Sequence, residues 1–137
     1  MEEFQVKARY ADGSIGPINI KTQEIEKDGG GVDIHLSNAD GLSSQAFSEQ
    51  SAFSALLEIR KNLDNQGIQL PCLAADRRVF PSPMQESMGY GNLAYRNVLG
   101  RQALSSDIVN IYESRDDMEC VPVSEQLKFH SKWLSSL

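Results

Sequence analysis

The chain has 137 residues, of which 40% are hydrophobic and 23% are charged, and its formal net charge is −6 at pH 7. This length and composition are ordinary for one folded domain rather than a disordered chain, so we expect residues 1–137 to form a single globular domain. No apolar run approaches the roughly 20 residues of a membrane helix. Because the N-terminus also lacks the layout of a signal peptide, we expect a cytoplasmic protein.

The negative charge is concentrated in the N-terminal half. Residues 1–68 contain 11 acidic and 6 basic side chains, whereas residues 69–137 contain 8 and 7. Binding to DNA or RNA requires clustered Lys and Arg for the phosphates, so we expect no direct nucleic-acid partner. An acidic surface suits a basic protein partner, and solubility alone is the other explanation of this charge.

Alternation of apolar and polar residues predicts three strands at the N-terminus, joined as an antiparallel meander. The segments are residues 4–10, 18–22 and 32–36. An Asp12-Gly13 pair supplies the first turn. Ile25 falls on the opposite parity, which predicts a bulge near Gln23 or a frayed strand end.

Asp33 and His35 share one face of the third predicted strand. A carboxylate beside an imidazole is compatible with catalysis or metal binding. Two ligands are too few for a metal site, however, and no third ligand follows at a matching spacing. The pattern therefore favours a solvated face of the sheet.

A helix is predicted after a loop at residues 37–47. Ser48 is the expected N-cap, and Gly67 stands where a left-handed residue ends a helix. Between them lies a broad apolar stripe at helical spacing, which predicts packing on the meander. Its members are Ala52, Phe53, Leu56, Leu57, Ile59 and Leu63.

The C-terminal half is expected to contain short strands followed by a second helix. We expect a short edge strand at 68–73, a strand at 93–99 and a strand buried on both faces at 107–113. Ser124 is the expected N-cap of a helix that runs to the C-terminus. His130 lies at the edge of its apolar stripe, which predicts a packed, hydrogen-bonded histidine rather than a general base.

These elements follow the order βββαβββα. The sequence therefore predicts an α+β fold in which two helices pack on a largely antiparallel sheet of five to six strands. The two cysteines, Cys72 and Cys120, are expected to be small buried hydrophobic residues rather than a disulfide or a redox pair.

No catalytic or cofactor motif stands out, and we expect no enzymatic activity, cofactor or metal. Gly89-Tyr90-Gly91 lacks the third glycine and the following helix of a nucleotide-binding loop, so the glycines are expected to allow a turn. The acidic run Asp116, Asp117 and Glu119 lacks the pattern of a calcium loop. It is expected to be solvated or to contact a complementary charge.

A binding loop is predicted at residues 82–91. It contains Glu86, Met84, Met88 and Tyr90, and exposed Met and Tyr side chains are typical of recognition surfaces. The alternative is that both Met side chains fold inward. The residues that we expect to bind a partner are Glu86, Met88, Tyr90, Asp116, Asp117 and Glu119.

From residue 79 to 112 the pattern VFPSPMQESMGYGNLAYRNVLG…DIVNIY resembles small bacterial immunity proteins. These accompany polymorphic or contact-dependent growth-inhibition toxins, and they are short, acidic, cytoplasmic and without catalytic signatures. The resemblance implies that the chain binds one toxin domain, often a nuclease, and neutralises it. It assigns no binding residue by position, because the family is diverse.

Three hypotheses follow. The leading one is a non-enzymatic inhibitor that holds a basic toxin domain through aromatic or Met anchors and through carboxylates that face Lys and Arg. The second is a small-molecule-binding or undetected enzymatic domain with a pocket near Tyr90 and Tyr95. The third is a structural subunit of a larger assembly.

Overall fold

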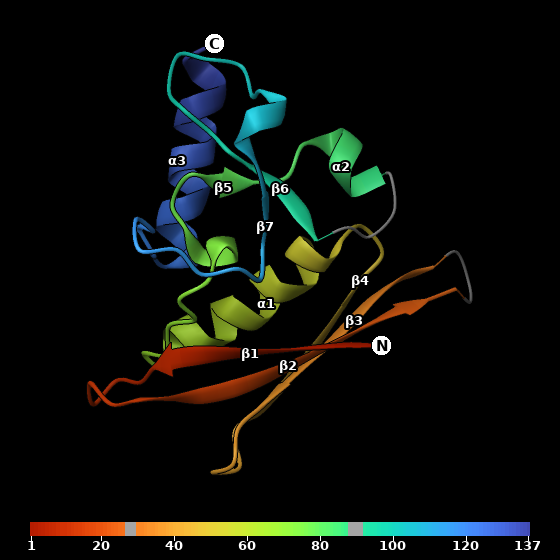
Figure 1. Ribbon diagram of the computed structural model, residues 1–137, viewed down its shortest axis with the longest axis vertical. Coiled ribbons are helices and arrows are strands. Elements are labelled where there is room, and N and C mark those ends of the chain that lie inside the picture. The colour runs from red at the N-terminus through yellow and green to blue at the C-terminus, as the bar shows by residue number, and fades with distance from the viewer. Residues whose placement is uncertain (27–29, 88–91) are drawn as a thin grey trace.

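A computed structural model describes residues 1–26, 30–87 and 92–137 (Figure 1). The first four strands form one antiparallel sheet in the order β1-β2-β3-β4. They are β1 (Glu2–Arg9), β2 (Ile15–Ile25), β3 (Gly31–Ser37) and β4 (Ser43–Ser48). Helix α1 (Ala52–Asn65) follows and lies across this sheet (Figure 1).

The strands and helices that follow lie on the opposite side of α1 (Figure 1). A second antiparallel sheet has the order β5-β6-β7, and two further helices accompany it. The elements are β5 (Val79–Phe80), α2 (Pro83–Ser87), β6 (Leu93–Arg96), β7 (Ile108–Asn110) and α3 (Val123–Ser135). The predicted α+β class is therefore confirmed, but the single sheet of five to six strands with two helices is not.

The main core lies between α1 and the four-stranded sheet. Inward residues of the strands alternate with exposed ones, because successive side chains of a strand point to opposite faces. The buried apolar residues here are Val6, Ala8, Ile18, Ile20, Val32, Ile34 and Leu36 from the strands and Ala52, Phe53, Ala55, Leu56, Ile59 and Leu63 from α1. The predicted packing of this helical stripe on the meander is confirmed.

Both ends of α1 depend on local chemistry. Its N-cap is Ser51, whose hydroxyl accepts a hydrogen bond from the Ser54 amide at 3.1 Å. The predicted N-cap, Ser48, instead ends β4 and accepts from the Gln50 amide, so this prediction was wrong by three residues. Gly67 has a φ of 70°, which confirms the predicted left-handed end.

Two expectations about the first sheet were wrong. The predicted loop at 37–47 contains most of β4, whose inward residues Ser44, Ala46 and Ser48 oppose Leu36, Ile34 and Val32. Small and polar inward residues give no apolar alternation, which is why the strand was missed. Over its described residues the β2–β3 ladder has no bulge and continues in regular register to the Ile25↔Gly31 pair.

The predicted strands of the C-terminal half were too long. Residues 68–73 form only a single bridge, between Arg9 and Gln69, and a 3₁₀ turn follows at Leu73–Ala75. The predicted strand at 107–113 exists only over Ile108–Asn110, and the expectation that it is buried on both faces was wrong, because Ile108 is exposed. Ile111 is nevertheless fully buried and its amide donates to the Asn92 carbonyl at 2.8 Å, so its apolar character reports burial rather than strand structure.

Helix α3 packs against α1 and the second sheet rather than on the four-stranded sheet, which corrects the expectation that both helices share one sheet. It begins at Val123 after Pro122, so Ser124 lies inside it and is not its N-cap. The buried Gln126 side chain donates to the carbonyls of Ala74, Asp76 and Val79. Polar contacts, in addition to its apolar face, therefore fix the position of α3.

Candidate functional site

A pocket of about 370 Å³ lies where the end of the first sheet meets α2. Its walls are Glu49 and Gln50, between β4 and α1, and Pro83 and Glu86, on α2. We call these four residues the acidic pocket. Across the described ranges, neither carboxylate has an ion pair with a cationic side chain. The pocket therefore presents uncompensated negative charge.

Glu86 is held in place by α1. The Ser54 hydroxyl, in the first turn of α1, lies 3.2 Å from Glu86 Oε2 and donates a hydrogen bond to it. This contact joins residues 32 positions apart. Of the described residues predicted to bind a partner, Glu86 lines this pocket, and its neighbour Glu49 was not predicted.

A capping box shapes α2. The Ser82 hydroxyl accepts a hydrogen bond from the Gln85 amide at 3.0 Å, and Gln85 Oε1 accepts from the Ser82 amide at 2.9 Å. Ser-x-x-Gln with Pro83 at the first helical position is a recognised helix start. The prediction of a loop here was therefore wrong, although the signal for a helix was present in the sequence.

The predicted anchors Met88 and Tyr90 lie outside the described residues, as do Gly89 and Gly91. Tyr95, which we associated with a second pocket, is a half-buried residue of β6 paired with Phe80 and Ile108.

The acidic loop Asp116, Asp117 and Glu119 differs from its expected state. We expected only Arg115 to offset these charges, but Asp117 pairs with Arg96 at 2.9 Å and Glu119 pairs with Arg77 at 2.7 Å. The Arg96 hydrogen bond lowers the pKa of the Asp117 carboxyl. The arginines come from positions far earlier in the chain, so local charge counting could not find them, and only Asp116 stays exposed without a cationic partner in the described part of the chain.

Buried Asp76 holds Arg96 and a further arginine, Arg78. Its side chain is fully buried and accepts hydrogen bonds from Arg78, from Arg96 and from the Glu119 amide. Burial acts to raise the pKa of this carboxyl, but the hydrogen bonds and charge of Arg78 outweigh it and the pKa is lowered. Asp76 is therefore an ionised structural group, and no local sequence pattern indicated its role.

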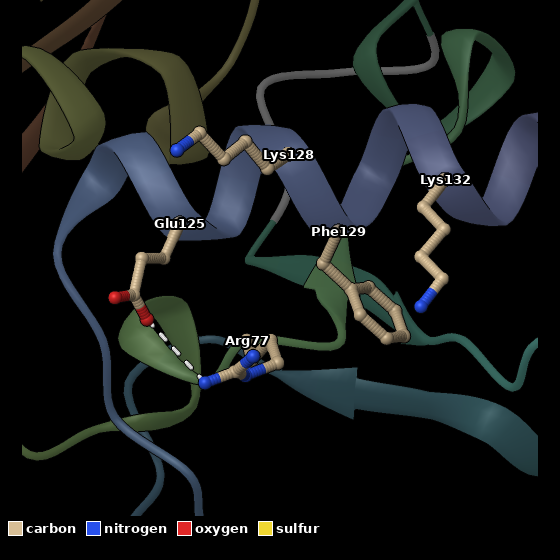
Figure 2. A pocket seen from close by; sticks show the side chains of 5 residues that line it. All are labelled: Arg77, Glu125, Lys128, Phe129 and Lys132. Carbon is tan, nitrogen blue, oxygen red and sulfur yellow. Dashed lines mark hydrogen bonds and ion pairs between the residues drawn. The ribbon is translucent and has the colours of Figure 1, made fainter.

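A second groove, of about 330 Å³, runs beneath α3 (Figure 2). Phe129 and Lys132 point from the helix toward the side where Arg77 lies, and Arg77 pairs with Glu125 at 3.3 Å (Figure 2). Lys128 completes the lining. We call this the cationic groove, because its lining contains three cations and one carboxylate, whereas the whole chain has a net negative charge. Arg77 and Glu125 are 48 positions apart in the sequence.

The Asp33 and His35 side chains lie on the outer face of the four-stranded sheet, as predicted. His35 Nε2 lies 2.9 Å from the Ser43 hydroxyl, but Asp33 accepts from Gln45 and does not orient the imidazole. A serine nucleophile requires a base that is itself oriented by a third group, and this pair lacks that arrangement. Among the described residues, no group of three or more His, Cys, Asp and Glu could hold a metal ion.

His130 and Cys72 occupy packed sites. The His130 ring stacks on Phe80 with centroids 3.8 Å apart, which confirms the expected packing, but its buried Nδ1 has no hydrogen-bond partner among the described residues. Burial lowers the pKa of His130 and raises that of the Cys72 thiol to about 11. Both cysteines are free, and the buried Cys72 behaves as the predicted small hydrophobic residue, whereas Cys120 is only half-buried.

No protein-family model matches the chain, and no curated protein sequence matches it either. Within the described residues, the helices are too short or too polar to cross a lipid bilayer.

Proposed function

We propose that this chain is a non-enzymatic immunity protein that binds and neutralises a basic toxin domain, which the resemblance suggests is a nuclease. The observation that carries the proposal is the acidic pocket. The pocket is concave and contains two carboxylates that have no cationic partner in the described structure. One of them, Glu86, lies two residues before Met88 in the sequence, where the binding anchors Met88 and Tyr90 were predicted. A lysine or arginine of the partner is the group that such a pocket fits.

The acidic loop is the weaker candidate for the interface. Two of its three carboxylates already pair with arginines of this chain. A partner cation would have to replace those arginines, so little net charge attraction remains. In the described structure Glu86 and Glu49 have no such competitor.

The first test looks for a toxin domain encoded immediately beside this chain and produces the two proteins together. We expect the two proteins to co-purify, and we expect co-expression of this chain to restore growth to cells that produce the toxin domain. Failure of both experiments would reject the immunity function.

Variants then test the pocket. Glu49→Gln with Glu86→Gln keeps the size and hydrogen-bonding shape of both side chains while removing their charges. We expect slower association, a weaker dependence of association on salt, and affinity lower by about tenfold or more. Glu58→Gln is the matched control, because Glu58 is an exposed residue of α1 that already pairs with Lys61. Equal binding by all three forms would move the interface away from the pocket.

A further inference from the structure

A third concavity, of about 240 Å³, lies beside the second sheet and is lined by three arginines. Arg78 stands before β5, Arg96 ends β6 and Arg115 lies in the loop after β7. Asn97 and Ser106 also line it. We call these five residues the arginine pocket. Three segments distant in sequence thus bring guanidinium groups to one cavity.

Two of the guanidinium groups are fixed before any ligand arrives. Arg78 and Arg96 both bond to the buried carboxylate of Asp76, and both also donate to the main-chain carbonyl of Asp117. Arg96 donates as well to the Asp117 carboxylate at 2.9 Å. Fixed donors lose little freedom when they bind a ligand, which favours binding.

Donor capacity remains in the pocket. Within the described residues Arg78 Nη1 makes no hydrogen bond, and Arg115 has only an ion pair of 3.7 Å with the exposed Glu113. Asp107 is the one carboxylate in the lining, and it is occupied by Arg101, whose Nη2 lies 2.9 Å from both of its oxygens, and by the Leu104 amide. Its charge is therefore already paired with a cation of this chain, as are the charges of Asp76 and Asp117.

Asn97 adds a buried, unpaired polar group to the lining of this pocket. The residue is only 3% exposed, and its side-chain oxygen is buried without a hydrogen-bond partner in the described part of the chain. Buried polar groups are normally paired. A half-turn of the amide exchanges its oxygen and its NH₂ group, so Asn97 can present either a donor or an acceptor at this position.

We propose that the arginine pocket binds a phosphate group, either as free phosphate or as the phosphate of a small ester. In the described structure the unbonded Nη1 of Arg78 and the weakly paired guanidinium of Arg115, together with a hydroxyl and an amide, offer donors from several directions. Such donors match the several oxygens of a tetrahedral anion better than the two coplanar oxygens of a carboxylate. This site lies apart from the acidic pocket and binds a ligand of opposite charge, so it goes beyond the proposed toxin neutralisation and does not depend on it.

The experiment titrates the isotopically labelled full chain with inorganic phosphate, at ionic strength matched with chloride, and follows the amide and arginine side-chain signals by NMR. We expect saturable shifts centred on Arg96, Asn97 and Ser106. Arg115→Gln should lower the affinity about tenfold, which corresponds to 1.4 kcal/mol, without changing the thermal unfolding temperature, because Arg115 is exposed and weakly paired.

Lys132→Gln is the matched control, since it removes the same charge from the cationic groove. It should bind phosphate as the parent does. Loss of binding in Lys132→Gln but not in Arg115→Gln would assign the anion to that groove and overturn the proposal, as would the absence of saturable shifts. A nucleoside monophosphate distinguishes a phosphate ester from free phosphate as the ligand of the arginine pocket. If it binds more tightly than inorganic phosphate, the ligand is an ester. If it binds with equal affinity, the pocket recognises the phosphate group alone.

Discussion

The two sides of α1 hold the chain in different ways. On one side, four strands of 6 to 11 residues form continuous ladders, and the buried residues facing α1 are almost all apolar. On the other side, the strands have only 2 to 4 residues, and buried polar side chains connect the segments. Asp76, Asn97 and Gln126 are buried there, and Arg60 reaches into this side from α1.

The difference shows how short strands can be stabilised. A ladder of two or three residues provides few backbone hydrogen bonds, so the remaining carbonyl groups need other donors. Gln126 and Arg60 supply them: the Arg60 guanidinium donates to the carbonyls of Ala74 and Val121 and to Gln126 Oε1. Side chains thus replace the missing ladder, and the same region contains the arginine pocket and the cationic groove.

The largest expected effect is on this polar connection. Gln126→Leu leaves Arg60 and the carbonyls of Asp76 and Val79 short of partners in a buried place. We expect the free energy of unfolding to fall by about 3–5 kcal/mol, as when one partner of a buried charged interaction is removed. Urea denaturation measures it, with Gln102→Leu, an exposed position, as control. If Gln126→Leu lost no more unfolding free energy than Gln102→Leu, packing alone would hold α3.

The apolar side is tested by Leu56→Ala. Leu56 is fully buried between α1 and the first sheet, so we expect a loss of about 2–5 kcal/mol from the cavity that the substitution creates. Leu134→Ala, at a residue that is 53% exposed, should change little. If both variants had equal denaturation midpoints, the core would not lie beneath α1.

The next effect depends on pH. Asp76→Asn should lower the free energy of unfolding at neutral pH by about 2–3 kcal/mol, because two arginines lose their shared carboxylate. The pKa of Asp76 is lowered in the folded chain, so its ionised form stabilises the fold above the unfolded value of about 3.9. That stabilisation is lost as the pH falls toward the folded pKa.

Acid titration of unfolding therefore separates Asp76→Asn from the parent. The variant should show a flatter loss of stability below pH ~4. Asp116→Asn, in the exposed loop, should follow the parent. An unchanged acid limb in Asp76→Asn would mean that the buried carboxylate is not what titrates there.

The smallest expected effect comes from His130. Burial lowers its pKa, so the unfolded chain binds the proton more readily and stability declines as the pH falls from the ordinary histidine value of about 6.5. His130→Phe should remove that slope while changing stability at pH 7.5 by less than about 1.5 kcal/mol, since the position is only half-buried and a phenyl ring can keep the stacking on Phe80. His35→Gln, at an exposed site, should keep the slope, and a slope that persisted in His130→Phe would assign it to another group.

The difference between the two sides of α1 also explains which elements could be predicted from the sequence. Alternation along β1, β2 and β3 and the stripe of α1 are local patterns that directly report burial, and they were found. β4 was not, because Ser44 and Ser48 face inward and hide the alternation. The C-terminal side depends on contacts such as Arg60 with Gln126, which are 66 positions apart, and no local pattern records such a pair.

The candidate site was predicted only in part for the same reason. Glu86 was identified from the residue types in its loop, but its contact with Ser54 and its neighbour Glu49 arise from the fold. The acidic loop was overestimated because Arg77 and Arg96, which neutralise it, lie in other segments.

The place of the only tryptophan gives this molecule a built-in optical reporter. Trp133 is 9% exposed, and its indole N–H donates to the carbonyls of Val98 and Arg101. Its emission therefore reports the environment of the C-terminal side, whereas far-ultraviolet circular dichroism reports secondary structure in both. Coincident transitions in the two signals during denaturation would mean that the polar-connected side and the ladder side melt as one cooperative unit. A fluorescence change at lower denaturant would identify the C-terminal side as a separately unfolding unit.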